Sequence, residues 1–334
     1  MNLLSFVTLF FLSLLPFGYS TESPQQQFCQ KMKAEYARYH WGEDSCANNE
    51  WTTVRKSVLG HPLIWTVFGG ELEKLPPDKV DTTLILCGVH GDEITPIKFC
   101  FDIIDDLKKD YKTKYGDKLI IIAPVVNPDA FFKKSPTRTN ANGVDLNRNF
   151  PTGNWKSLAH TLWKNTYRSD PRRNPGPSPL SEPEVVFQIN LIKRYHPDKI
   201  ISVHSPLTML DYDGPGLKFK YKKGPKISPK ISPKTADGPE TLKGKKAFDL
   251  LLTMSQKANG YRVRQFKTYP GSLGNWAGLE RKIPTYTLEL PSSDPSKTDE
   301  YWRQFSQAIN EAILNNLDGV DLAVDHKKSS GPAL

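Results

Sequence analysis

A histidine and a glutamate with metal-ligand spacing follow a strongly apolar run of the chain. The run covers residues 82–89 and breaks off into His90-Gly-Asp-Glu93. An imidazole and a carboxylate three residues apart can converge on one ion, because the glycine lets the turn fold tightly. A second His-x-x-Glu, His40 to Glu43, has no apolar run before it. The preceding run therefore favours His90 and Glu93 as half of a zinc site.

Two further apolar runs end in residues that complete such a site. Residues 199–203 stop at His204, and residues 284–290 contain Glu289 near their end. Two histidines and a carboxylate leave the fourth position of tetrahedral zinc to water, which is typical of a catalytic site. A carboxylate that is not a ligand must then accept the water's proton and pass it to the leaving amine. Glu289 is the candidate, because a charge in an apolar strand is costly without a function or partner.

Each of these residues also has a plainer interpretation when it is taken alone. His204 is then a hydrogen-bonded core histidine, and Glu289 is a glutamate that faces solvent from an edge strand. Arg138, Asn147 and Arg148 come from an irregular polar loop and are, taken singly, ordinary surface residues. Together they offer anion-binding groups, because a guanidinium binds a carboxylate in bidentate fashion and a second one stabilises an oxyanion near zinc.

Alternating strands and helices must position these side chains. Apolar runs predict buried strands, and helical spacing or capping signals predict helices, at residues 82–89, 94–109, 119–126, 181–195, 199–203, 245–259, 284–290 and 298–317. Residues 51–68 alternate in polarity as edge strands do. The pattern predicts an α/β fold, a three-layer αβα sandwich around a mixed, largely parallel sheet. Ligands bind beyond the carboxyl ends of such strands, where the runs end at His90, Asn127, His204 and Glu289.

The N-terminus and the cysteines indicate export. Met1–Ser20 is apolar and ends in small residues before a polar stretch, which predicts a signal peptide, although no Lys or Arg precedes its core. An uncleaved anchor remains the alternative. An exported protein can keep disulfides, and we expect Cys29 to pair with Cys46 in the N-terminal segment. For Cys87 and Cys100, buried free thiols and a bridge stay open.

The net charge of +9 comes almost entirely from one segment of the 334-residue chain. Residues 216–246 contain ten lysines against Asp237 and Glu240, so that the remainder is nearly neutral. This distribution argues against a nucleic-acid partner, whose binding face would be basic within the folded domain. Prolines and like charges predict a mobile loop here.

The candidate residues stand in short motifs, namely His90-Gly-Asp-Glu93, Asn127-Pro-Asp, Arg138, Val144-Asp-Leu-Asn147-Arg148-Asn149-Phe150, Ser202-Val-His204-Ser205 and Thr287-Leu-Glu289-Leu290. In order and spacing, from about Trp51 to Leu317, these motifs resemble the zinc metallocarboxypeptidase family typified by carboxypeptidase A. Other segments are closer to the bacterial branch of murein tripeptide amidases and cell-shape carboxypeptidases, namely Leu180-Ser-Glu-Pro-Glu184, Asp211-Tyr-Asp-Gly-Pro215 and Tyr269-Pro-Gly-Ser-Leu-Gly-Asn-Trp276.

The resemblance implies a carboxypeptidase-like fold and a role for each candidate residue. One Zn²⁺ would be bound by His90, Glu93 and His204, with Glu289 as the general base and Arg138 as the oxyanion partner. The remaining candidates would contact substrate: Asn147 and Arg148 through its terminal carboxylate, and Tyr269 as the phenol nearest to the family's mobile tyrosine, in a register that stays open.

The resemblance also implies a substrate and a location. The branch cleaves the bond between γ-D-glutamate and meso-diaminopimelate in peptidoglycan stem peptides, so we expect a murein peptide substrate and a periplasmic or extracellular protein. No stable membrane span is expected after cleavage of the signal. The lysine-rich insert has no counterpart in the family. We expect it to contact anionic wall polymer, with a plain solvated loop as the alternative.

Together these features predict the domain organisation and leave three other functions open. We expect a signal peptide at 1–20, an N-terminal segment at 21–50, a zinc carboxypeptidase domain at 51–317 with the insert at 216–246, and a flexible tail at 318–334. The alternatives are a carboxypeptidase that acts on protein or peptide C-termini, a non-catalytic wall-binding module, and polyanion binding through the insert.

Overall fold

The computed structural model describes residues 22–215 and 242–317. The expected signal peptide at 1–20, the tail at 318–334 and most of the lysine-rich insert lie outside these ranges. The last residues assigned to the insert, 242–246, belong instead to the first turns of a helix that begins at Leu242. Within the described ranges, no helix is long and apolar enough to cross a bilayer.

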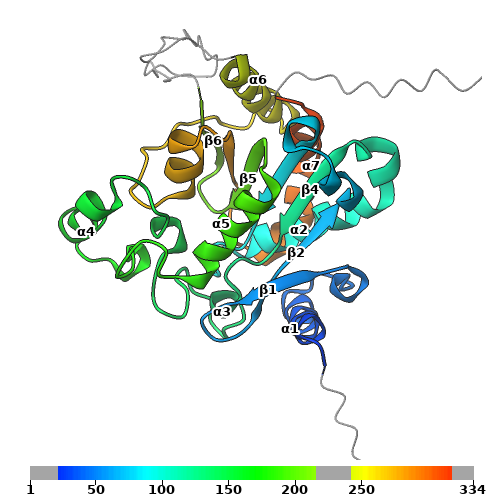
Figure 1. Cartoon of the computed structure of the whole chain (residues 1–334). Helices are drawn as coiled ribbons and strands as arrows, with labels where there is room; N and C mark the ends of the chain where they lie inside the picture. Colours follow the sequence, from blue (N-terminus) through cyan, green and yellow to red (C-terminus); the bar gives the residue numbers. More distant parts are fainter. Residues whose placement is uncertain (1–21, 216–241, 318–334) are drawn as a thin grey trace, which may run out of the picture.

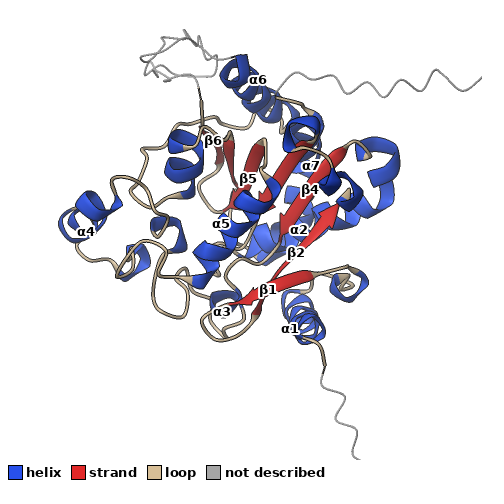
Figure 2. Ribbon diagram, viewed as in Figure 1, coloured by secondary structure: helices blue, strands red, loops and turns tan. Residues whose placement is uncertain are grey.

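A mixed sheet of seven strands forms the centre of the molecule (Figures 1 and 2). Its order is β1-β2-β4-β3-β5-β7-β6, with bounds β1 Thr52–Lys56, β2 Pro62–Phe68, β3 Asp81–Leu86, β4 Lys118–Ala123, β5 Lys199–His204, β6 Met209–Asp213 and β7 Thr285–Glu289. The four central strands β4, β3, β5 and β7 run parallel, and the outer pairings are antiparallel. The predicted fold class is confirmed, with the parallel part confined to the centre.

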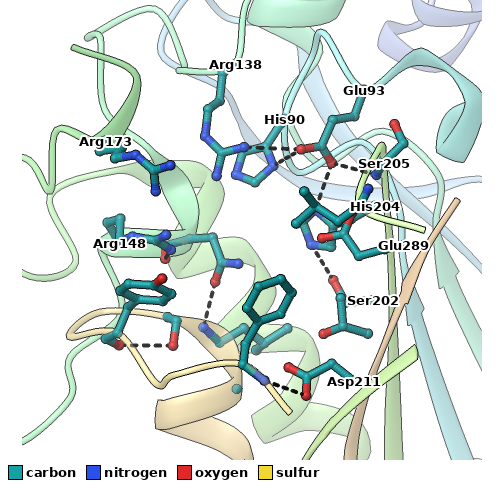
Figure 3. A pocket seen from close by; sticks show the side chains of 18 of the residues that line it. His90, Glu93, Arg138, Arg148, Arg173, Ser202, His204, Ser205, Asp211 and Glu289 are labelled. Carbon is teal, nitrogen blue, oxygen red and sulfur yellow. Dashed lines mark hydrogen bonds and ion pairs between the residues drawn. The ribbon is translucent and has the colours of Figure 1, made fainter. Parts of the chain in front are cut away.

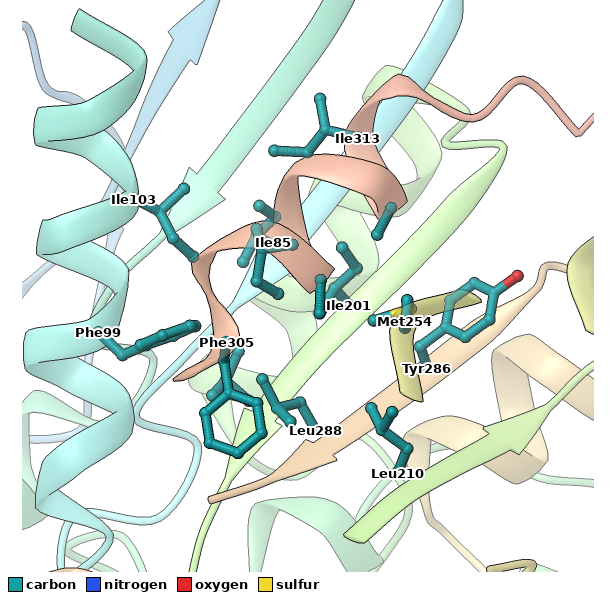
Figure 4. Close-up of a cluster of buried hydrophobic side chains, with 14 of the residues drawn as sticks. Ile85, Phe99, Ile103, Ile201, Leu210, Met254, Tyr286, Leu288, Phe305 and Ile313 are labelled. Atoms are coloured by element: carbon teal, nitrogen blue, oxygen red, sulfur yellow. The ribbon is translucent and has the colours of Figure 1, made fainter. Parts of the chain in front are cut away.

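Helices cover both faces of the sheet because its central strands are apolar on both sides. Ile85 of β3 faces a core shared with α2 (Ile94–Asp110), α6 (Leu242–Lys257) and α7 (Thr298–Leu314), part of which Figure 4 shows. Its neighbour Leu84 faces the opposite core, which includes α5 (Pro183–Tyr195). Successive side chains of a strand point to opposite faces, so one buried strand supports both layers.

The N-terminal segment is part of the domain rather than an appendage. It contains α1 (Pro24–Tyr39), which the sequence did not predict and whose buried face packs against β2 and α2. Disulfides join Cys29 to Cys46, the preferred pairing, and Cys87 to Cys100, one of the two open alternatives. The second bridge links the residue after β3 to α2.

Shorter elements connect this frame. The remaining α-helices are α3 (Pro128–Phe131) and α4 (Trp155–Asn165). Short 3-10 helices lie at η1 (Cys46–Asn48), η2 (Gly70–Lys74), η3 (Pro77–Lys79), η5 (Leu146–Arg148), η6 (Pro171–Arg173) and η8 (Pro295–Lys297), and π-helical segments lie at η4 (Tyr111–Tyr115) and η7 (Gly274–Glu280). The sequence Ser181-Glu-Pro-Glu184 predicts a capping box at the start of α5, with Ser181 as the N-cap, and this prediction is wrong. The N-cap is Glu182, without a side-chain cap, and Ser181 Oγ donates to the Glu182 carboxylate instead.

Candidate metal centre and active site

Three predicted ligands meet at the carboxyl ends of neighbouring strands. His90 and Glu93 follow β3, and His204 ends β5, which pairs with β3. Their candidate ligand atoms all lie within 4.8 Å of one another. Nδ1 of His90 lies 2.8 Å from Oε1 of Glu93, and Nδ1 of His204 lies 2.8 Å from Oε2 of the same carboxylate (Figure 3). The strand order therefore brings residues separated by more than a hundred positions to one point.

The chemistry of this cluster fits zinc. All three side chains are buried, and two imidazoles with one carboxylate are the donor set of an open, catalytic zinc site. Burial alone would raise the pKa of Glu93, but His90 and His204 hold it well below its usual value. The carboxylate is therefore anionic at neutral pH, as a ligand must be.

The far nitrogens of both imidazoles are fixed by other side chains. Nε2 of His90 lies 3.1 Å from Oδ1 of Asp145, and Nε2 of His204 lies 3.0 Å from the Ser202 hydroxyl. Such contacts orient each ring and leave Nδ1 to the ion. Asp145 was missed as a functional residue, although it stands within one of the family motifs, because its contact with His90 spans 55 positions of the chain.

Arg138 lies between this ligand cluster and Asp145. Its Nη1 donates to Oε1 of Glu93 at 3.1 Å, and its Nη2 lies 3.0 Å from Oδ2 of Asp145. Asn127, expected at the site because it follows a strand, does not line the cavity. Its Nδ2 donates instead to the backbone carbonyls of Val89 and Arg138, both at 3.4 Å. That expectation is wrong because a position after a strand does not fix the direction of a side chain, and Asn127 supports the loop.

Glu289 lies beside the ligands at the end of β7. It pairs in register with His204 of β5, and Oε2 accepts a hydrogen bond from the Leu207 amide at 3.3 Å. Burial raises the pKa of its carboxyl, His204 lowers it and Glu93 raises it, with a net upward shift. A carboxylate of raised pKa is suited to accept and return a proton near neutral pH.

Arg148 provides a buried cation that forms no ion pair with a carboxylate of the described residues, although the charge of Asp145 is near it. Its Nη1 donates to the Asn147 carbonyl at 2.6 Å, while Nε has no hydrogen-bond partner within the described ranges. The guanidinium lies 4.4 Å from the ring centroid of Tyr269, and Asn147 Oδ1 accepts from the Leu273 amide at 2.8 Å. A buried donor without an acceptor is costly, so this geometry fits an incoming carboxylate.

One cavity of about 500 Å³ is lined by all eight predicted site residues: His90, Glu93, Arg138, Asn147, Arg148, His204, Tyr269 and Glu289. It is also lined by charged residues that sequence reasoning did not assign: Asp92, Asp170, Arg172, Arg173, Asp211, Asp213 and Lys267. Asp92 is paired with Arg172 at 2.6 Å, and Arg173 stacks on Tyr167 at 4.5 Å. For Asp211 and Asp213 the available signal was two charges in an otherwise apolar strand.

Comparisons with known proteins agree with this geometry. The family described as zinc carboxypeptidase matches residues 50–314. Murein peptide amidase A of Vibrio campbellii is 31% identical over 253 residues, which cover 75% of this chain and 82% of that protein. Murein peptide amidase A of Escherichia coli K12 is 33% identical over 159 residues, 47% of this chain and 59% of that protein, so the match spans less than two thirds of its length.

A solved structure shows the same fold at lower identity. Bovine thrombin-activatable fibrinolysis inhibitor, in complex with tick carboxypeptidase inhibitor, aligns with a TM-score of 0.55 and 20% identity, covering 88% of this chain and 97% of that one. The family match spans most of the sequence and includes every residue of the metal cluster. The chain therefore belongs to the zinc carboxypeptidase family.

Proposed function

We propose that this chain is a zinc-dependent carboxypeptidase or amidase that hydrolyses the γ-D-glutamyl-meso-diaminopimelate bond of peptidoglycan stem peptides. The observation that carries the proposal is the convergence of His90, Glu93 and His204 with Glu289 in the cavity that contains Arg148. The murein peptide amidases among its relatives support the choice of substrate.

Binding and orientation fall to the loop that contains Asn147 and Arg148. The open Nε of Arg148 donates to the terminal carboxylate of the substrate, and the Tyr269 ring supports the guanidinium from one side. Asn147, fixed by its bond to the Leu273 amide, borders the same carboxylate. These contacts place the last peptide bond between the metal ligands and Glu289, which converts binding into orientation.

A zinc ion bound by His90, Glu93 and His204 would supply Lewis acidity and lower the pKa of the attacking water. Glu289 accepts a proton from that water while the water oxygen bonds to the scissile carbonyl carbon. Arg138 donates to the carbonyl oxygen as negative charge develops there. The C–N bond then breaks, and Glu289 returns the proton to the leaving amine nitrogen.

Mass analysis of defined fragments tests the proposal. Metal-loaded protein is incubated with murein tripeptide and tetrapeptide, with and without a chelator, beside Glu289→Gln. We expect release of diaminopimelate from the tripeptide, lost on chelation and in the variant, while metal analysis shows that the variant still binds zinc. Cleavage of neither fragment by metal-loaded protein would contradict the proposal. Cleavage of ordinary L-peptides alone would move the function to protein or peptide C-termini.

We further propose that the protein acts outside the cytoplasm. Two disulfides within the described ranges support this location, because such bonds persist in oxidising compartments. Contact between the lysine-rich insert and anionic wall polymer stays a prediction. Deletion of residues 216–241 tests it by sedimentation with purified wall, where wild-type-like binding would argue for a solvated loop.

A further inference from the structure

One cation on the cavity wall is used neither at the metal centre nor in the proposed reaction. Arg173 of η6 lines the cavity, and Figure 3 shows its guanidinium near those of Arg138 and Arg148. Burial lowers the pKa of Arg148, and the charges of Arg138 and Arg173 lower it further, so the three cations are neighbours. The Arg173 side chain is 39% exposed, which leaves it open to a ligand that enters from solvent.

Arg173 is less completely paired than the arginine beside it. Arg172 donates to the Asp92 carboxylate at 2.6 Å. The carboxylate nearest to Arg173 in the described ranges is that of Asp170, whose Oδ2 lies 3.6 Å from Nε, which is too far for a hydrogen bond. Oδ1 of Asp170 accepts instead from the Arg172 amide at 2.9 Å, as the N-cap of η6. The Nη groups of Arg173 can therefore bind an incoming anion in bidentate fashion.

The backbone on both sides of Arg173 is fixed to the loop of the active site. Nε of Arg138 donates to the Arg172 carbonyl at 3.1 Å. The Asp145 amide donates to the Asn174 carbonyl at 2.8 Å. Arg173 is thus held beside the residue assigned to the scissile carbonyl oxygen. Because this backbone is already ordered, less conformational entropy is lost when the side chain binds a ligand.

Two neighbouring aromatic rings connect Arg173 with Arg148. The Arg173 guanidinium lies 4.5 Å from the ring centroid of Tyr167, and that of Arg148 lies 4.4 Å from the centroid of Tyr269. The two ring centroids are 6.2 Å apart. The four side chains form a row in which each ring supports one cation. Such a row on one wall fits a ligand that carries two carboxylates.

A γ-linked glutamyl residue would supply the second carboxylate. When the peptide bond is made through the γ-carboxyl group, the α-carboxylate of the same residue stays free. Four C–C bonds separate the scissile carbonyl carbon from the carbon of that carboxylate, a reach of about 5 Å. With the carbonyl oxygen at Arg138, this reach brings the α-carboxylate to the neighbouring Arg173, while the terminal carboxylate lies at Arg148. An uncharged residue at the same place would leave Arg173 without an anion.

We propose that Arg173 binds the free α-carboxylate of the residue before the scissile bond, so that the enzyme prefers an acidic γ-linked residue there to a neutral one. The inference rests on the proposed function and deepens it, because it assigns recognition of the acyl side of the substrate to a side chain of η6. The terminal carboxylate at Arg148 and the internal one at Arg173 then fix the substrate at two points on either side of the scissile bond.

Three tripeptides that differ only in the middle residue test this subsite. Each begins with L-alanine and ends with meso-diaminopimelate. The middle residue is γ-linked D-glutamate, D-isoglutamine, in which a neutral amide replaces the α-carboxylate, or 4-aminobutyrate, which lacks the group. We expect kcat/KM of metal-loaded protein to be about 30-fold higher for the glutamyl peptide than for either neutral peptide, because both lose a charge-assisted hydrogen bond. Equal values for all three would overturn the subsite and leave the hydrolase intact.

Variants assign the preference to one side chain. Arg173→Gln is expected to lower kcat/KM for the glutamyl peptide about 30-fold, to the value of the neutral peptides, while metal analysis shows that the variant still binds zinc. Arg173→Lys keeps the charge without the forked donors and should retain part of the preference. Arg168→Gln removes an exposed arginine of the same segment that does not line the cavity, and this matched control should keep the preference. A preference that survives in Arg173→Gln would contradict the proposal.

A binding measurement distinguishes failure of the subsite from failure of the proposed function. Calorimetry with metal-loaded Glu289→Gln protein compares the three peptides without turnover. Tighter binding of the glutamyl peptide, lost when Arg173→Gln is added, would support the subsite even if no peptide is hydrolysed. Equal binding of the three peptides, or binding of none, would refute the subsite whether or not hydrolysis occurs.

Discussion

Buried carboxylates occur in two parts of the cavity with opposite electrostatic surroundings. At the metal centre, Glu93 and Asp145 contact imidazoles and the Arg138 guanidinium, and both pKa values lie below the ordinary range despite burial. On β6, neither Asp211 nor Asp213 forms an ion pair with a Lys, Arg or His of the described residues, and burial holds both pKa values above the ordinary range. Burial raises the pKa in both regions, and the upward shift is reversed only where cationic side chains contact the carboxylate. The charges of the first region are therefore balanced within the described residues, whereas those of the second are not.

Loss of the proton acceptor is expected to have the largest effect, and it tests the metal-centre half of the comparison. Glu289→Gln should lower kcat by about 1,000-fold, because general base catalysis contributes on this order. Steady-state kinetics on murein tripeptide measures it. Glu280→Gln, on the outer part of η7, is the control and should retain activity. A loss of less than tenfold would assign the proton transfer to another group.

The second-largest effect is expected from Asp145→Asn, which weakens the charge balance at the metal centre. The amide keeps the shape but removes the charge that faces His90 and Arg138, so zinc affinity should fall about 10- to 100-fold. Competition with a chromophoric chelator measures the dissociation constant. Asp170→Asn is the control, because it removes a partly exposed carboxylate of the cavity lining that does not contact the metal ligands. Unchanged affinity would show that Asp145 acts on Arg138 alone.

A pH series of unfolding free energies tests the unbalanced region. The pKa of Asp213 is about 7 in the folded protein against an ordinary value of 3.8, so wild type loses stability as pH rises from about 4 to 7. Asp213→Asn does not undergo this loss, so its free energy of unfolding at pH 8 should exceed that of wild type by about 1 to 2 kcal/mol. A shift in pKa corresponds to at most about 1.4 kcal/mol per unit, and the expected gain is smaller than that limit because water in the cavity screens the charge.

The opposite sign is expected at the metal centre. The pKa of Asp145 is lowered, so its contribution is present above about pH 4 and lost as pH falls, and Asp145→Asn should be destabilised at pH 8. Denaturant titrations of both variants at pH 4 and pH 8 give the comparison. Shifts of the same sign for the two variants would refute the contrast between the regions.

The smallest expected effect concerns Arg148, a buried cation that forms no ion pair with a carboxylate of the described residues and only feels the charge of Asp145 nearby. Tyr269→Phe keeps the ring beneath the guanidinium and should change KM by less than about threefold, whereas Tyr269→Ala removes a contact of about 0.5 to 1 kcal/mol and should raise KM severalfold. A large fall in kcat with Tyr269→Phe would instead assign the phenol a catalytic part.

The sequence predicted those site residues whose position follows from one strand. His90, His204 and Glu289 each mark the end of a buried run, and parallel pairing then brings the ends together. The contact between Asp145 and His90 depends on the path of an irregular loop, and no periodic pattern in the sequence predicts that path. Asp211 stood in a recognised motif, but its direction follows only from the β6–β7 register. Asn127 was misplaced for the same reason, since a strand end gives position without orientation.

The bridge between Cys87 and Cys100 encloses the turn that contains two of the three metal ligands. It joins residues 13 positions apart, and both His90 and Glu93 lie inside that interval. The turn is thus a covalent macrocycle, comparable to a cyclic chelator whose donors are gathered before the ion arrives. Much of the entropy cost of ordering these donors is met during oxidative folding rather than at metal uptake.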